Sequence, residues 1–243
     1  MSSLILASSF FQAYRYSDFF GKSIFFALFI LSITSWVLMI YKIKLIKKVK
    51  RESILFDSLL ESKNNLFFFK KEDFENYNPY LEIYSSLKDK TLKILNKNKY
   101  FGEIKDDEKI WLSRTDIDLV ESQTDASLSK NIKFLLKNLF VLSTVVTLAP
   151  FLGLLGTVWG ILITFSNLDS SNINSAVLSG ISMALATTVL GLIVAIPALV
   201  AYNYLKSEIK DFEEDMNLFS NKLIATLEMQ YRKVEGCEKK REF

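Results

Sequence analysis

The chain has 243 residues, 50% of them hydrophobic, and its mean hydropathy is positive at +0.20, which fits a small membrane protein with several spans. Its formal net charge of +3 is small, and we expect no nucleic-acid partner. Histidine is absent and Cys237 is the sole cysteine, which excludes an intrachain disulfide, a cysteine metal cluster and a histidine general base. We therefore expect no enzyme, no metal site and no cofactor.

The first predicted element is a transmembrane helix over 20–41, preceded by an N-terminal segment 1–19. The run from Phe19 to Tyr41 is free of charge after Lys22, and a span needs roughly 20 apolar residues. Basic residues follow this run directly: Lys42, Lys44, Lys47, Lys48, Lys50 and Arg51. Because basic loops stay in the cytoplasm, the N-terminus is predicted to be periplasmic. Residues 1–19 lack a basic region and a clear cleavage site, so this span is expected to remain as an anchor.

The segment 42–141 is predicted to form a cytoplasmic helical domain. Pro79 after Asn78 predicts the start of a helix. The acidic run 106–108 predicts another helix start, and we expect a single helix from about Asp107 through the second span to Phe165. Apolar residues at helical spacing form three expected stripes: Ile54, Leu55, Leu59 and Leu66; Leu81, Tyr84, Leu87, Leu92 and Leu95; and Ile117, Val120, Leu128, Ile132, Leu135 and Leu136.

Two more charge-free runs, Asn138 to Leu168 and Ser170 to Leu205, are long enough to cross a bilayer. The predicted segments are transmembrane helices at 142–166 and 178–203, a periplasmic loop 167–177 and a cytoplasmic tail 204–243. The tail is expected to continue the helix of the third span as far as about Lys233. The predicted fold is therefore an all-α membrane protein with three transmembrane helices, of which the second and third extend into a cytoplasmic helical domain.

Small residues recur every three or four positions in the second and third spans, so that they share one face of each helix. These residues are Ala149, Gly153, Gly156, Gly160 and Thr164 in the second span, and Gly180, Ala184, Thr188, Gly191 and Ala195 in the third. Close helix packing alone explains such a pattern. The hydroxyl groups of Thr157, Thr187 and Thr188 beside these residues favour a second interpretation, an ion pathway.

Each of these spans contains one proline, Pro150 or Pro197. A proline cannot donate to the carbonyl four residues earlier, so the carbonyls of Val146 and Ile193 need other partners. Two alternatives stay open: local bending of the helices, or hydration of an ion pathway.

Two blocks of sequence, one in the second span and one in the third, resemble the TolQ/ExbB/MotA family of proton-driven stator subunits. The resemblance is greater to TolQ and ExbB than to MotA. The matching residues are Ala149-Pro150-Phe151-Leu152-Gly153-Leu154-Leu155-Gly156-Thr157-Val158-Trp159-Gly160-Ile161, Gly180-Ile181-Ser182, Ala184-Leu185-Ala186-Thr187-Thr188, Gly191-Leu192, Ala195-Ile196-Pro197-Ala198 and Ala201-Tyr202-Asn203. The three-span plan matches too, and the sequence Ser32-Ile33-Thr34-Ser35-Trp36 leans toward TolQ.

The resemblance implies a pentamer of this chain in the bacterial inner membrane, around a dimer of a single-span TolR-like or ExbD-like partner whose Asp carries the proton. It implies use of the proton motive force for envelope maintenance or uptake through a TolA-like or TonB-like protein. It also places pore threonines at Thr157 and Thr188. Many relatives carry Glu at the position that Met183 occupies here. Because Met183 replaces it, the second and third spans contain no Asp, Glu, Lys, Arg or His. A passive membrane scaffold and a solute permease subunit are the alternatives.

Overall fold

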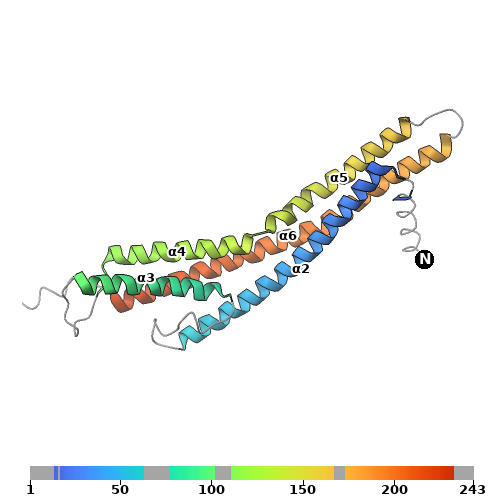
Figure 1. Ribbon diagram of the computed structural model, residues 1–243. Helices are drawn as coiled ribbons and strands as arrows, with labels where there is room; N and C mark the ends of the chain where they lie inside the picture. Colours follow the sequence, from blue (N-terminus) through green and yellow to red (C-terminus); the bar gives the residue numbers. More distant parts are fainter. Residues whose placement is uncertain (1–13, 16, 63–76, 102–110, 167–172, 233–243) are drawn as a thin grey trace, which may run out of the picture. The chain divides into compact units, whose positions relative to one another are not determined.

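The fold is built from α-helices, and Figure 1 shows them in the computed structural model. The structure describes residues 14–15, 17–62, 77–101, 111–166 and 173–232. In chain order the helices are α2 (Phe19–Glu61), α3 (Pro79–Phe101), α4 (Arg114–Leu136), α5 (Leu139–Ser166) and α6 (Ile173–Tyr231). Among these residues, extended pairing is limited to one isolated parallel bridge, between Leu112 and Arg232. The all-α fold is therefore confirmed.

The chain divides into two compact units. Unit 1 contains residues 1–44 and 137–207, and unit 2 contains residues 45–136 and 208–243. Three helical stretches are long and apolar enough to cross a membrane: Phe19–Glu61, Arg114–Ser166 and Gly180–Tyr231. This finding confirms the three predicted membrane-crossing helices. The expected continuation of the third span is also confirmed, because α6 runs for 59 residues without interruption to Tyr231.

The predicted unbroken helix from Asp107 to Phe165 is wrong. Helix α4 ends at Leu136 and α5 begins at Leu139, because Asn138 adopts a left-handed conformation with a φ of 67°. Asparagine tolerates this conformation better than other non-glycine residues do. The proposed start at residues 106–108 lies outside the described residues.

Helix α4 instead starts at Arg114, and its first turn is closed by a reciprocal pair of hydrogen bonds. The Asp116 amide donates to the Ser113 hydroxyl (3.2 Å), and the Ser113 amide donates to the Asp116 carboxylate (3.0 Å). Burial by itself would raise the pKa of Asp116, but hydrogen bonds from Ser113 and Asn98 outweigh it and lower that pKa. Both partners in this cap thus stabilise the start of α4.

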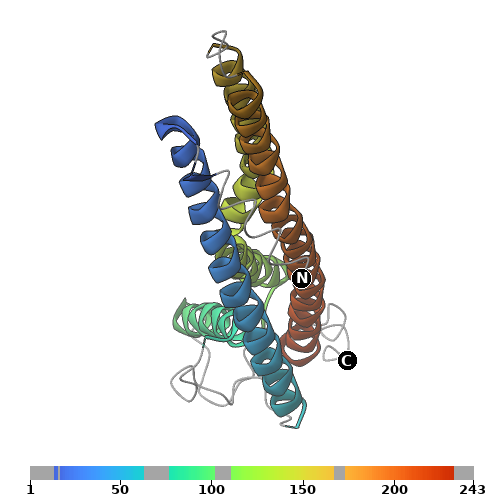
Figure 2. The same ribbon diagram turned by 90° about the vertical axis from the view of Figure 1, so that its right-hand side faces the viewer.

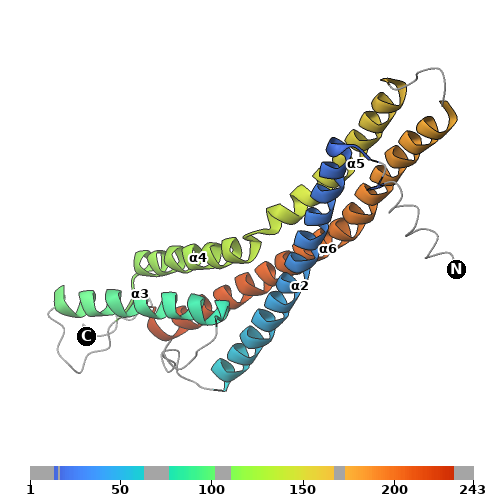
Figure 3. The ribbon, with the colours of Figure 1, turned by 45° about the vertical axis from the view of Figure 1, so that its right-hand side comes forward.

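Unit 2 has its apolar core between α2, α3, α4 and α6. Tyr80 of α3 stacks on Phe219 of α6 with ring centroids 4.2 Å apart, and Phe56 of α2 lies edge-on to Phe219 at 6.3 Å. Asn78 confirms the predicted helix start at Pro79, because its side-chain oxygen accepts from the Tyr80 amide at 3.0 Å. Figure 3 shows α3 beside α4 in this unit.

The three apolar stripes predicted for this region have different outcomes. The buried members are Leu81, Tyr84, Leu87, Ile117, Val120, Leu128 and Leu135. Leu92 and Leu136 are exposed, Leu95 and Ile132 are half-buried, and Leu66 is not among the described residues. The α2 stripe is wrong, because Ile54, Leu55 and Leu59 are exposed and the buried face is Ile46, Val49, Ser53, Phe56 and Leu60. Two apolar faces compete on α2, and the one that carries the large Phe56 ring is the buried one.

Candidate functional site

The candidate site lies in unit 1, where α5 and α6 run side by side in opposite directions (Figures 2 and 3). Their contact is made by facing small residues, which we call the small-residue interface: Ala149, Gly153, Gly156, Gly160 and Thr164 of α5, with Gly180, Ala184, Thr187, Thr188 and Gly191 of α6. The predicted faces therefore meet each other within one chain. Ala195, also predicted on this face of α6, is buried.

The glycines of this interface have no space for a side chain. A Cβ on Gly160 would lie 3.0 Å from the Ala184 Cβ, and one on Gly191 would lie 2.6 Å from the Ala149 carbonyl oxygen. A Cβ on Gly156 would overlap the side chain of Thr187. Such close backbone approach is how small residues hold membrane helices together. The glycines of the predicted packing set therefore lie against the facing helix of the same chain.

Two of the predicted threonines belong to this interface. The Thr188 hydroxyl donates to the Gly153 carbonyl of α5 at 3.1 Å. Thr187 is fully buried, and its hydroxyl donates at 2.8 Å to the Ala184 carbonyl of its own helix. Together the two residues place hydroxyl groups within the α5–α6 contact, and the Thr187 hydroxyl also donates to the Gly153 carbonyl of α5 at 3.4 Å.

Thr157 lies outside the small-residue interface. It is half-buried in the single chain, and its hydroxyl donates at 2.7 Å to the Leu154 carbonyl of its own helix. This hydroxyl is therefore not held by α6, and a neighbouring chain can approach it.

Pro150 and Pro197 lie inside α5 and α6, and both helices continue through them. The nearby Thr147 hydroxyl donates to the carbonyls of Ser143 (3.3 Å) and Thr144 (3.1 Å). It therefore does not serve the Val146 carbonyl that Pro150 leaves without its helical donor.

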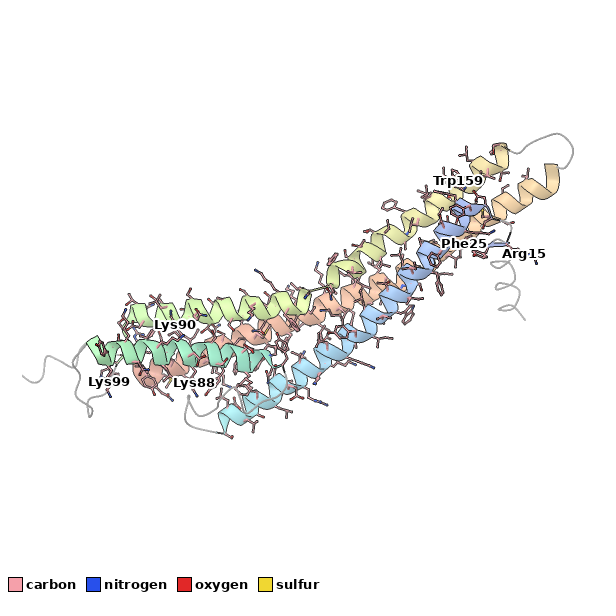
Figure 4. All side chains as sticks on the ribbon, in the orientation of Figure 1. Arg15, Phe25, Lys88, Lys90, Lys99 and Trp159 are labelled. Carbon is pink, nitrogen blue, oxygen red and sulfur yellow. The ribbon has the colours of Figure 1, made fainter. Side chains whose placement is uncertain are left out.

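An acidic side chain that the sequence analysis missed lies against α5 at the N-terminal end of α2. The Trp159 indole N–H donates to Asp18 at 2.9 Å, and the other Asp18 oxygen accepts from the Gly21 amide at 3.0 Å. The Phe20 ring lies 4.4 Å from the Trp159 ring. Figure 4 shows Trp159 beside the beginning of α2. Asp18 before an apolar run is a recognisable helix-start signal, but nothing in the sequence links it to Trp159.

Met183 occupies the position where the resemblance places Glu in many relatives. Its side chain is 6% exposed and fills the space beside Gly21 of α2. An apolar packing residue therefore stands at this position. No Asp, Glu, Lys, Arg or His occurs in 142–166 or 180–203, the described parts of the second and third predicted spans.

Comparison with known proteins agrees with this geometry. The profile of the "MotA/TolQ/ExbB proton channel family" matches residues 93–218, which is more than half of the 243-residue chain. This chain belongs to that family. The matched range contains the whole small-residue interface, whereas Asp18 and all of α2 precede it.

Individual relatives carry both ExbB and TolQ names. The chain is 43% identical to "Biopolymer transport protein ExbB" of Aquifex aeolicus over 81 residues (32% of this chain, 55% of that protein). It is 49% identical to "Putative biopolymer transport protein ExbB-like 2" of Helicobacter pylori strain 26695 over 77 residues (30% and 51%). It is 35% identical to "Tol-Pal system protein TolQ" of Haemophilus influenzae over 106 residues (43% and 46%). The chain spans about half the length of the curated relatives it matches.

Proposed function

We propose that this chain is the multi-span subunit of an inner-membrane ion channel or motor that uses the proton motive force to energise the cell envelope. It works with a single-span TolR-like or ExbD-like partner, in Tol-Pal-type maintenance or TonB-type uptake. Copies of the chain form a homo-oligomer, as a pentamer around a partner dimer. The observation that carries this proposal is the small-residue interface with its Thr188 hydroxyl, which lies within the range matched by the family.

The second and third predicted spans contain no Asp, Glu, Lys, Arg or His, and this supports a proton carrier on the partner. A proton crossing hydrocarbon needs a titratable group or a continuous chain of water, and hydroxyl groups do not titrate near neutral pH. The described parts of the second and third predicted spans contain no side chain that titrates near neutral pH. The partner's carboxylate therefore supplies the titrating site, while Thr157 and Thr188 orient that acid or a water beside it. The membrane potential contributes roughly 2.3 kcal/mol per charge per 100 mV to the transfer.

Proton flux in liposomes tests this assignment. The purified chain is reconstituted alone, with the single-span partner, and with a partner whose transmembrane Asp is changed to Asn. We expect flux with the native partner only. Specific flux from this chain alone, or unchanged flux with the Asn partner, would contradict the proposal. Flux that requires sodium in place of protons would keep the need for a partner and change the ion.

A passive scaffold is the main competing function. Removing the threonine hydroxyl groups distinguishes it from an ion channel. A scaffold needs the shape of the α5–α6 packing, but it needs neither the Thr157 hydroxyl outside that packing nor the Thr188 hydroxyl within it. Full activity of both Thr157→Val and Thr188→Val in assembled complexes would favour the scaffold.

The proposed orientation places the N-terminus and the 167–177 loop in the periplasm and the tail 204–243 in the cytoplasm. It is supported by the basic residues after Tyr41. An impermeant thiol reagent applied to cells with a permeabilised outer membrane should miss Cys237. The same reagent should label Ser171→Cys in a Cys237→Ser background. The opposite labelling pattern would reverse the orientation.

A further inference from the structure

Unit 2 exposes an apolar face on α2 that its own core does not use. Ile54, Leu55 and Leu59 are 58%, 52% and 46% exposed, and they follow one another at helical spacing. The exposed basic residues Lys47, Lys48 and Arg51 precede them on the same side of the helix. We call these six residues the α2 face. Large apolar side chains exposed together mark an interaction surface.

A second exposed face lies on α6 in the same unit, with the opposite charge. Its first residues are the acidic Asp211 and Glu214, and the apolar Leu218 follows at 68% exposure. Ala225 and the exposed Met229 continue the same side of the helix. We call these five residues the α6 face. Each face therefore begins with charged residues and carries apolar ones after them; on α6 the exposed Lys222, paired with Asp57 and Glu61, stands between Leu218 and Ala225.

The two faces match at three levels along the unit. The contact of Phe56 with Phe219 fixes one common level of α2 and α6, and the ion pairs of Lys222 with Asp57 and Glu61 show that the two helices run in the same direction. Counted back from that level, Leu55 corresponds to Leu218, Arg51 to Glu214 and Lys48 to Asp211. A neighbouring copy related by rotation about an axis along these helices keeps the levels unchanged.

We infer that the α2 face of one copy packs against the α6 face of the next copy. Opposite charges then meet at two levels, and the leucines meet at the level below them. Such a contact joins two different surfaces, and repeating it about a closed rotation axis, as in the proposed homo-oligomer, gives a ring. The inference rests on the homo-oligomer of the proposed function and adds a contact that lies outside the predicted spans.

Arg51 and Glu214 can exchange their present partners for this contact. Arg51 pairs with the adjacent Glu52 at 3.5 Å, and Glu214 pairs with Lys210 at 4.0 Å, in both cases with the face residue well exposed. Exposed pairs of this kind contribute about 0–1 kcal/mol. The two side chains can therefore change partners when another copy docks.

Cross-linking of two differently tagged chains tests the contact. Both chains carry Cys237→Ser; one carries Leu55→Cys and the other Leu218→Cys, and they are co-expressed and oxidised in membranes. We expect disulfide-linked dimers that contain both tags, and a ladder up to the complete ring when one chain carries both cysteines. The matched control replaces Leu218→Cys by Asn217→Cys, because Asn217 is exposed on α6 outside the α6 face. The control should cross-link at least about tenfold less.

Exchange of the charges provides a second measurement on the same cysteine pair. Arg51→Glu alone and Glu214→Arg alone should each lower the cross-linked fraction, and the two together should restore it. Intact oligomers in native mass spectrometry without mixed-tag dimers would overturn the inferred contact and leave the proposed homo-oligomer standing. Monomers alone would instead contradict the proposed function. Absent cross-links together with protection of Leu55→Cys by anionic-lipid vesicles would reassign the α2 face to the membrane surface and overturn the contact.

Discussion

Trp159 and Asp18, 141 residues apart in the sequence, are joined by a hydrogen bond of 2.9 Å from the indole N–H to the carboxylate. The same carboxylate accepts from the Gly21 amide and so closes the first turn of α2. One side chain therefore both starts this helix and fixes its beginning to α5.

Replacing Trp159 by Phe should weaken the attachment of α2 while keeping the aromatic contact with Phe20. A hydrogen bond to a charged group contributes about 1.5–3 kcal/mol to the stability of the folded state, and this contribution is lost with the indole N–H. Hydrogen exchange of amides 19–25 in the purified protein should then become faster, with the rest of unit 1 unchanged. Asp18→Asn is the matched variant, because Asn still caps the helix and accepts from the indole. Acceleration in Asp18→Asn without acceleration in Trp159→Phe would show that charge, and not the indole contact, holds this end.

Adding a methyl group at Gly156 should disrupt the hairpin of α5 and α6. Its Cβ would overlap the Thr187 side chain, which is fully buried, and overpacking of this kind typically costs about 1–3 kcal/mol. Gly156→Ala should therefore lower the melting temperature of the purified complex, and Gly156→Leu should prevent assembly in native mass spectrometry. Leu155→Ala, at an exposed neighbouring position, is the control. An unchanged melting temperature for Gly156→Ala would mean that the two helices separate at this point.

Removal of single hydroxyl groups should separate conduction from packing. Thr157→Val and Thr188→Val keep the side-chain shape, and we expect each to reduce partner-dependent proton flux by about two- to tenfold, the equivalent of one hydrogen bond. Thr187→Val is the matched control, because Thr187 is fully buried and its hydroxyl bonds mainly within its own helix, to Ala184 at 2.8 Å, with a longer bond of 3.4 Å to the Gly153 carbonyl. It should assemble and conduct normally. A larger loss of flux from Thr187→Val than from Thr188→Val would reverse these two assignments.

The cap of α4 should make unit 2 sensitive to acid. The pKa of Asp116 is lowered in the folded chain, so its contribution to stability is complete above the ordinary value of 3.8 and is lost as the pH falls through the folded value. Ser113→Ala should cost about 1 kcal/mol at pH 7. In urea unfolding followed at several pH values, the difference between this variant and the parent protein should shrink below about pH 4. A difference that stays constant into this range would show that Asp116 is not the group involved.

The membrane helices and their packing residues could be predicted because both are encoded locally. A charge-free run predicts a span, and glycines three or four residues apart share one helix face, as Gly153, Gly156 and Gly160 do. The break at Asn138 could not be predicted in this way, because the sequence there has no glycine or proline. The contact of Asp18 with Trp159 was missed because residues so far apart carry no common pattern.

The stripe on α2 shows a different limit of local patterns. Periodicity identifies an apolar face but does not say whether it is covered by the same chain or by another one. Ile54, Leu55 and Leu59 have the spacing of a core face and are exposed in a single copy. Only the position of Phe56 in the aromatic core shows which face the chain itself covers.

The absence of space at Gly156, Gly160 and Gly191 restricts how this gene can change. Every single-nucleotide change of a glycine codon that alters the amino acid introduces a side chain or stops translation. No amino-acid change that a single nucleotide substitution can produce at these three positions therefore preserves the close contact of α5 with α6. In a library of random variants selected for activity, these three positions should remain glycine, while the exposed positions between them, such as Val158 and Ile161, exchange freely among apolar residues.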